Sequence, residues 1–167
     1  MAVKLKVREA TPESFAPFGD LVAPGDREST VRLEGMEYWA DLARIPSQGR
    51  DLGLGFATQA VRPPVQKTAE RHMNTPELLL ATGGEMIVVV GPPNHPEEPG
   101  RLPAASRFQA FRIPEGVAVV FRPGVWHYAP FAVSETIRLL VIYVAGTSES
   151  DATVVDFPPD QHLELDL

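Results

Sequence analysis

The sequence predicts an all-β fold, either a β-sandwich or a closed jelly-roll barrel, with one short helix near the N-terminus. Prolines and glycines, 17 and 13 of 167 residues, divide the chain into short segments, as in proteins built from many strands and turns. About eight to ten of these segments have the character of strands, a number typical of two packed sheets or a barrel. We expect one domain over residues 1–167, which is long enough to cover a single core.

The composition excludes several classes of partner. The net charge is −7 and the sequence pI is about 5.1, so the surface repels the phosphates of nucleic acid. The absence of cysteine excludes disulfides, thiol catalysis and thiolate metal sites, and it fits a reducing compartment. Residues 1–7 alternate like a strand and lack the apolar core of a signal peptide, and no run approaches the roughly 20 apolar residues of a membrane span. We expect a soluble cytoplasmic protein with no nucleic-acid or membrane partner.

The N-terminal helix follows the first strand. Thr11 supplies a capping hydroxyl and the next residue is a proline, which is favoured at the first helical position. From this short helix we expect Phe15 and Phe18 to face the core, and we expect Gly19 to end the helix.

The segments that follow read as strands separated by turns. Residues 31–39 are expected to form one strand with Tyr38 and Trp39 as packing residues, and residues 52–60 form the next. The two glycines of the second strand lack the spacing and the strand-to-helix context of a nucleotide-binding loop.

The central and C-terminal parts continue this pattern. Residues 91–100 form an acidic, proline-rich loop in which His95 is expected to be solvated, with a flap over a site as the alternative. The tail, residues 160–167, is expected to be loosely held or docked on a partner subunit, and His162 in it shows no sign of a site. The other expected strands cover residues 65–72, 88–90, 107–113, 116–121, 134–145 and 153–157, and the 134–145 segment is the strongest buried strand.

Two segments far apart in the chain carry the side chains that could bind a metal or take part in catalysis. Alternate residues of a strand share a face, so Glu70 and His72 point the same way. A turn at residues 74–76 allows Glu77 to lie back towards His72, and a distant strand can bring in His127. Imidazoles and carboxylates that meet in a small barrel can bind a divalent metal or a small acid. Histidines in such chains also serve in packing, and we weigh the two interpretations about equally. Trp126 and Tyr128 alternate away from His127 and are expected to pack, with a place in the pocket wall as the alternative.

These segments resemble the two motifs of cupins. The run His72-x4-Glu77-x6-Gly84 is similar to the first motif, and Gly124-x2-His127 is similar to the end of the second. Together with the run Pro17-Phe18-Gly19-Asp20, the pair more narrowly resembles the ureidoglycolate lyase family, a cupin family of allantoin catabolism, over most of the chain. The resemblance implies a cupin-like double-stranded β-helix, the jelly-roll barrel.

The resemblance also implies an activity and a ligand set. Members cleave ureidoglycolate, a small carboxylate, to glyoxylate and urea in purine nitrogen catabolism, as homodimers with nickel or another divalent ion such as zinc or manganese; a metal-free site is the alternative. In this chain His72, Glu77 and His127 would hold the metal, and the catalytic residues would be Glu70, His72 and His127, with Glu70 or His127 transferring protons. Without a metal, a cation from Arg71, Arg122 or Lys67 would have to balance the substrate carboxylate.

Departures from the family pattern leave two other functions open. Glu70 stands where cupins usually have their first histidine, and Gly83 stands where some members have a basic residue. Phe131 stands where an asparagine is common. The alternatives are another cupin enzyme that acts on a small hydroxy or keto acid, and a metabolite-binding cupin without turnover.

Overall fold

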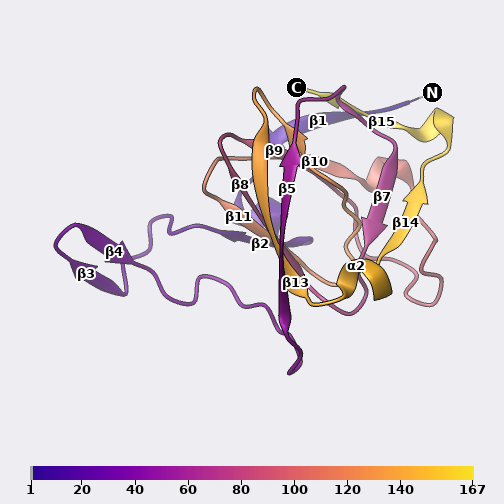
Figure 1. Ribbon diagram of the computed structural model, residues 1–167. Helices are drawn as coiled ribbons and strands as arrows, with labels where there is room; N and C mark the ends of the chain where they lie inside the picture. The colour runs from indigo at the N-terminus through magenta and orange to yellow at the C-terminus, as the bar shows by residue number, and fades with distance from the viewer. Residues whose placement is uncertain (1) are drawn as a thin grey trace.

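Two curled β-sheets face each other in the computed structural model, which describes residues 2–167 (Figure 1). Within these residues the larger sheet has six strands, in the order β12 (Phe131–Ala132), β9 (Met86–Val90), β10 (Gln109–Ile113), β1 (Val3–Glu9), β15 (Leu163–Asp166) and β6 (Val65–Gln66). The other has five, in the order β2 (Gly19–Val22), β11 (Ala118–Phe121), β8 (Glu77–Thr82), β13 (Ile137–Val144) and β5 (Leu52–Gln59). Two-stranded sheets are formed by β7 (Thr68–Arg71) with β14 (Thr153–Asp156), and by β3 (Val31–Leu33) with β4 (Met36–Tyr38).

The main apolar core lies between the two large sheets. Met86, Val88 and Val90 alternate inward from β9, and they meet Leu79 and Ala81 of β8 across the barrel. This two-residue period places every second side chain in the core. The expected all-β jelly-roll barrel of the cupin type is therefore confirmed. None of the helices formed within residues 2–167 combines the length and the hydrophobicity that a bilayer-spanning segment requires.

The short N-terminal helix, α1 (Pro12–Phe15), is confirmed, but it ends earlier than expected. Thr11 caps it through its hydroxyl, which accepts a hydrogen bond from the Ser14 N–H at 3.1 Å. Phe15 and Phe18 are buried in the core as expected. Gly19 does not end the helix: it begins β2, where a Cβ atom would lie 1.9 Å from the carbonyl oxygen of Val120 on β11. The glycine is needed for this close approach of two strands and not for a helix cap.

The expectation of a loose C-terminal tail is wrong. Strand β15 pairs in parallel with β1 and antiparallel with β6, and Leu163 is fully buried. Leu163 and Leu165 alternate with Glu164 and Asp166, so the acidic tail contains an amphipathic strand that is part of the larger sheet, between β1 and β6. Strand β14 pairs with β7 and confirms the expected edge strand at 153–157.

The expected single strand over residues 31–39 is also wrong. The chain turns at Gly35, with φ 74°, and forms the hairpin β3–β4, which projects away from the barrel (Figure 1). Tyr38 is half exposed and does not pack in the core, because no part of the barrel lies beneath the hairpin. Trp39 donates its indole N–H to the Arg27 carbonyl at 2.8 Å. Of the expected first strand, residue 1 lies outside the described residues. The remaining short helices are η1 (Ala105–Arg107), α2 (Thr147–Ser150) and η2 (Pro159–Gln161).

Candidate active site

The two motif segments lie side by side as paired backbone. The Glu70 N–H donates to the His127 carbonyl at 2.6 Å, and the His127 N–H donates to the Glu70 carbonyl at 2.9 Å. The Gly124 N–H continues the ladder by donating to the His72 carbonyl at 2.6 Å. Opposite residues in such a ladder share a face, as do residues two apart. The backbone therefore directs Glu70, His72 and His127 to the same side, although 55 positions separate the two histidines, the difference between 127 and 72.

Both imidazoles reach a single carboxylate oxygen. Nε2 of His127 lies 2.8 Å from Oε2 of Glu77, and Nε2 of His72 lies 3.0 Å from the same atom. All three side chains are buried, and the two ring centroids are 5.3 Å apart. Phe121 stacks on the His127 ring at 4.6 Å and closes the apolar side of the cluster. Thus the three residues expected to hold a metal do come together.

The hydrogen bond made by Nδ1 fixes the tautomer of each histidine ring. Nδ1 of His72 lies 3.0 Å from the Asp151 carbonyl oxygen, and Nδ1 of His127 lies 3.0 Å from the Val125 carbonyl oxygen. A carbonyl only accepts, so each Nδ1 must carry the proton. In the neutral rings both Nε2 lone pairs then face the Glu77 oxygen, which brings together three electron-rich atoms. A proton or a metal cation has to lie among them.

The ionisation of the cluster follows from these contacts. Burial by itself would raise the pKa of Glu77, but its contacts with His127 and His72 outweigh burial and lower its pKa to about 2. Burial lowers the pKa of His72, yet the hydrogen bond and charge of Glu77 leave that pKa above its ordinary value. Glu77 is therefore a carboxylate at neutral pH and attracts positive charge to the Nε2 atoms.

The donor set fits a divalent ion. Ligands about 2.1 Å from an octahedral ion lie about 3 Å from one another, which is close to the 2.8 and 3.0 Å between Glu77 Oε2 and the two Nε2 atoms. Ligand atoms of Glu70, His72 and His127 also lie within 4.8 Å of one another, so Glu70 can serve as a ligand as well as a base. A second group, His95, Glu97 and Glu98, is more exposed and lies on the loop at 91–100.

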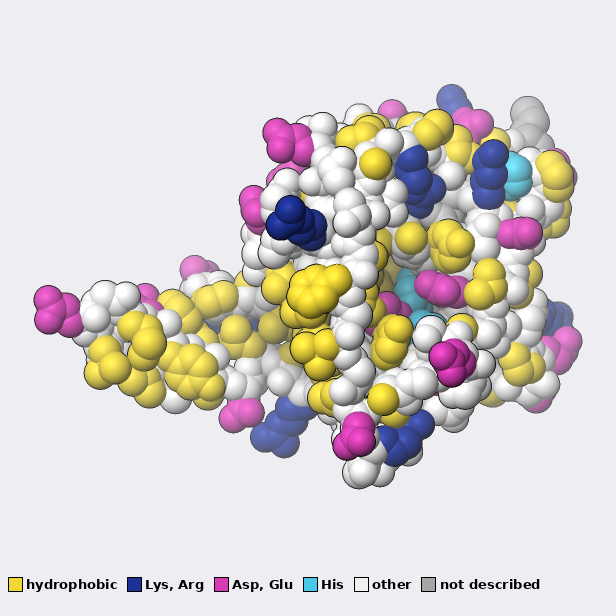
Figure 2. Space-filling view, viewed as in Figure 1, with side chains coloured by type: hydrophobic (Ala, Val, Ile, Leu, Met, Phe, Trp, Pro, Cys, Tyr) yellow, Lys and Arg dark blue, Asp and Glu magenta, His cyan; other side chains and the backbone are white. Residues whose placement is uncertain are grey.

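The cluster opens into a small cavity of about 160 Å³. Figure 2 shows histidine and acidic side chains gathered in a hollow of this face, beside β5. Pockets for drug-sized ligands measure about 300–1,000 Å³, so this cavity suits only a small molecule. A larger cavity, about 580 Å³, lies beside Leu21 and Val117 but holds no histidine. The smaller cavity is lined by Glu70, Glu77, His127, Gln59 and Tyr128 together with apolar side chains of β8 and β13.

Lysine and arginine are absent from the described residues that line this cavity. The three cations considered for a metal-free site lie elsewhere. Arg71 is buried under the loop at 91–100, Arg122 lies 3.8 Å from Asp20, and Lys67 lines a separate cavity. A substrate carboxylate in this site would thus depend on a bound cation for charge balance.

Comparison with known proteins decides the family. The family model described as ureidoglycolate lyase matches residues 2–164. The chain belongs to the ureidoglycolate lyase family. A ureidoglycolate lyase of Stutzerimonas stutzeri is 27% identical over 97% of this chain and 95% of its own length, and one of Burkholderia mallei is 29% identical over 85% and 83%. Among solved structures, Bacillus subtilis oxalate decarboxylase, described with Mn(II) centres, is 15% identical with a TM-score of 0.43 over 64% of this chain and 24% of its own.

Arg71 supports the site of this family member from the face of the β-ladder opposite to the cavity. Its guanidinium donates to the carbonyls of Pro99 at 3.0 Å, His95 at 3.1 Å and Glu98 at 3.0 Å, and it stacks on the Trp126 ring at 4.5 Å. The residues next to Glu70 and His127 therefore clamp the 91–100 loop on the opposite face of the ladder. Sequence reasoning missed this role, although the alternation that sends Arg71 and Trp126 away from the cavity was visible.

We expect Arg71→Met to destabilise the fold by about 3 kcal/mol, because buried carbonyl oxygens that accept from the guanidinium in the wild type lose their donor. Denaturant unfolding measures the change. Arg101→Met is the matched control: the exposed Arg101 side chain pairs with Glu98 at 2.8 Å and with no other side chain among residues 2–167, so its loss should cost less than about 0.5 kcal/mol. Equal stability of the two variants would contradict the clamp.

Asp151, which sequence reasoning also missed, fixes the histidine segment. Besides its carbonyl contact with His72, its carboxylate accepts from the N–H groups of Met73 at 3.0 Å and Asn74 at 2.8 Å. No sequence signal marks a contact between a histidine ring and a backbone carbonyl 79 residues away.

Asp151→Ala removes the carboxylate that fixes Met73 and Asn74 but keeps the carbonyl beside His72, so it should weaken the affinity of the site for a divalent ion by about 10-fold, the low end of the effect of disturbing an outer partner of a ligand. Isothermal titration with Zn²⁺ measures this affinity. Glu149→Ala, an exposed position of α2, the short helix that Asp151 caps, is the control and should leave the affinity unchanged. If both variants bind Zn²⁺ as the wild type does, the Asp151 carboxylate does not position His72.

Proposed function

We propose that this protein cleaves ureidoglycolate to glyoxylate and urea, as a carbon–nitrogen lyase of allantoin and purine nitrogen breakdown. The observation that carries the proposal is the convergence of His72 and His127 on one oxygen of Glu77, beside a small cavity that Glu70, Glu77 and His127 line. The family of the chain supports the same substrate class. The cysteine-free composition supports a place in the cytoplasm.

The reaction needs a base and an acid at one carbon. Ureidoglycolate carries a hydroxyl, a carboxylate and a urea nitrogen on the same carbon. Removal of the hydroxyl proton lets the oxygen form a double bond to carbon while the carbon–nitrogen bond breaks. The electron pair of that bond leaves with the urea nitrogen, which takes up one proton. The products are glyoxylate and neutral urea, so one proton moves from oxygen to nitrogen overall.

Glu70 is the residue we assign to the proton transfer. Its carboxyl group lines the cavity, and among the described residues its side chain forms no ion pair or hydrogen bond. It lies on the same face of the ladder as His127, within 4.8 Å of the imidazole nitrogens. Glu70 takes the hydroxyl proton and then returns it to the urea nitrogen. A positioned group of this kind accelerates a reaction by about 10²- to 10⁴-fold.

His72, Glu77 and His127 are the residues that would hold a divalent ion. Neutral imidazoles and carboxylates, with no thiolate in the chain, suit nickel, zinc or manganese. When bound, the ion supplies positive charge that balances the substrate carboxylate and lowers the pKa of the hydroxyl. The carbonyls of Asp151 and Val125 keep both Nε2 lone pairs directed into the site. The buried ring of Phe121 keeps water from one side of His127.

The test is a product assay on purified protein supplied with Ni²⁺, Zn²⁺ or Mn²⁺ in separate reactions. We expect glyoxylate and urea to appear in equal amounts from ureidoglycolate, and chelation to abolish the release. Turnover of another small hydroxy or keto acid in place of ureidoglycolate would instead identify a different cupin enzyme. Binding of glyoxylate without any turnover would identify a metabolite-binding protein. Either of these results would overturn the proposal.

A further inference from the structure

Two strand surfaces of this chain present apolar side chains to water. The first belongs to the arm, residues 23–50, which leaves the barrel after β2 and returns at β5 (Figure 1). At its end lies the hairpin β3–β4, which pairs Val31 with Tyr38 and Leu33 with Met36. A two-stranded hairpin by itself is only marginally stable in water, so an arm of this kind needs a surface to lie on.

The hairpin has one apolar and one charged face. Val31, Leu33, Met36 and Tyr38 share a face and are exposed by 39, 60, 48 and 52%. The charged pair Arg32–Glu37 occupies the other face, where its two side chains neutralise each other. This alternation is the pattern of a strand pair with one side buried. In residues 2–167 nothing covers the apolar side.

The second surface is the outer side of β5. This strand stands at the edge of its sheet, with only β13 beside it in the described chain. Leu52, Leu54 and Phe56 point outward and are exposed by 43, 69 and 81%. Such an edge, long and apolar, invites pairing with another chain, and proteins usually cover it.

We propose that these two surfaces cover each other between two copies of this chain: the arm of each copy lies on the β5 face of the other. This goes beyond the homodimer that the family resemblance implies, because it assigns the contact surfaces. Figure 2 shows the hydrophobic side chains of the arm and those over β5 on the same face of the molecule. A two-fold axis in front of that face exchanges the arms reciprocally, so that both unpartnered surfaces are used in each copy.

The area agrees with a stable dimer. With about 200 Å² for each large apolar side chain, the exposed parts of these seven residues in two copies amount to on the order of 1,500 Å². A standard stable interface buries about 1,600 Å². None of the seven side chains carries a charge, so burial leaves no unpaired ion. The seven residues counted in this area are Val31, Leu33, Met36, Tyr38, Leu52, Leu54 and Phe56.

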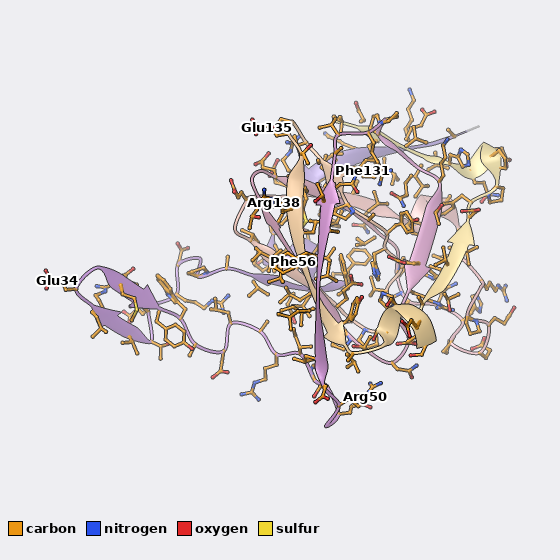
Figure 3. The ribbon with its side chains drawn as sticks, in the orientation of Figure 1. Glu34, Arg50, Phe56, Phe131, Glu135 and Arg138 are labelled. Carbon is orange, nitrogen blue, oxygen red and sulfur yellow. The ribbon has the colours of Figure 1, made fainter. Side chains whose placement is uncertain are left out.

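Charge complementarity favours a second copy as the occupant. Glu34 lies at the tip of the arm, and Arg138 lies above Phe56 on the neighbouring strand β13 (Figure 3). Both side chains are exposed. In the reciprocal arrangement Glu34 at the tip of one arm can pair with Arg138 of the other copy, which offsets part of the repulsion between two copies that each carry a net charge of −7.

Disulfide trapping tests the contact, because the chain has no cysteine of its own. Leu33→Cys and Phe56→Cys are made in separate chains and mixed under mild oxidation. We expect a cross-linked pair containing one chain of each kind. Arg32→Cys is the matched control: it lies on the charged face of the same hairpin and should not cross-link with Phe56→Cys. Equal cross-linking by both arm variants, or none by Leu33→Cys, would overturn the proposal.

Light scattering after size exclusion gives the second measurement. The wild type should elute as a dimer, and Phe56→Ser should raise the dissociation constant by about 10- to 1,000-fold, as for a central aromatic contact. Because Phe56 is exposed in the single chain, the variant should keep its circular dichroism spectrum. Thr58→Ser, next outward on the same strand, is the control. A monomeric wild type, or a Phe56→Ser dimer as stable as the wild type, would also overturn the proposal.

Discussion

Replacing His127 by alanine is expected to reduce the release of glyoxylate by at least about 1,000-fold, with little binding of a divalent ion left. His127 provides one of the two Nε2 atoms that face Glu77, and its backbone pairs with Glu70. With one imidazole gone, a single nitrogen ligand remains beside the carboxylates of Glu77 and Glu70, a weaker donor set for nickel or zinc than one with two imidazoles. Steady-state assays with added metal and metal analysis of the dialysed protein measure the two losses.

A second histidine substitution shows whether the effect belongs to the site or to the loss of any histidine. His162→Ala removes a histidine whose backbone carbonyl, which the substitution keeps, accepts from the Val3 N–H at 2.9 Å, and it should leave activity and metal content unchanged. Loss of His127 also leaves buried Glu77 with fewer partners, at a cost of about 1–3 kcal/mol, so unfolding curves of the metal-free proteins accompany the assays. A folded His127→Ala variant with wild-type activity would remove His127 from the mechanism.

Replacing Glu70 by glutamine is expected to lower kcat by about 10²- to 10⁴-fold while metal binding continues. The amide keeps the size of the carboxylate but cannot take a proton from the hydroxyl. His72, Glu77 and His127 are untouched, so the ion should still bind, with at most a modest loss from any direct ligation by Glu70. Single-turnover rates together with Zn²⁺ titration distinguish the two effects.

The control for this variant is Glu135→Gln, which changes an exposed glutamate at the surface (Figure 3) and should have no effect on kcat. If Glu70→Gln keeps the wild-type kcat, the proton must be taken by another group. If it loses metal and kcat together, Glu70 acts as a ligand and not as the base.

Strand periodicity carried much of the sequence prediction. Alternation placed Glu70 and His72 on one face, and the turn at 74–76 allowed Glu77 to lie back towards His72, as the 3.0 Å between His72 Nε2 and Glu77 Oε2 confirms. The cupin-type barrel and the helix capped by Thr11 are also confirmed, because both depend on local rules of turns and caps. The roles of Glu70, the identity of the metal and the single-domain organisation stay predictions.

Other features depend on what lies beneath a segment, and a sequence does not contain that information. Tyr38 alternates like a core residue, yet it belongs to an arm with no barrel under it. Leu163 sits in an acidic tail but is buried, because β1 offers a free edge. Arg71 and Asp151 act largely through backbone carbonyls and N–H groups, which leave no signature in side-chain spacing.

The most direct test of the metal centre is a crystal structure of the protein grown with Ni²⁺ and measured at the nickel absorption edge. The account predicts one anomalous peak per chain, about 2.1 Å from Nε2 of both His72 and His127 and bound by a carboxylate oxygen of Glu77 or Glu70. A site without a peak, or a peak found instead at the exposed group of His95, Glu97 and Glu98, would contradict it.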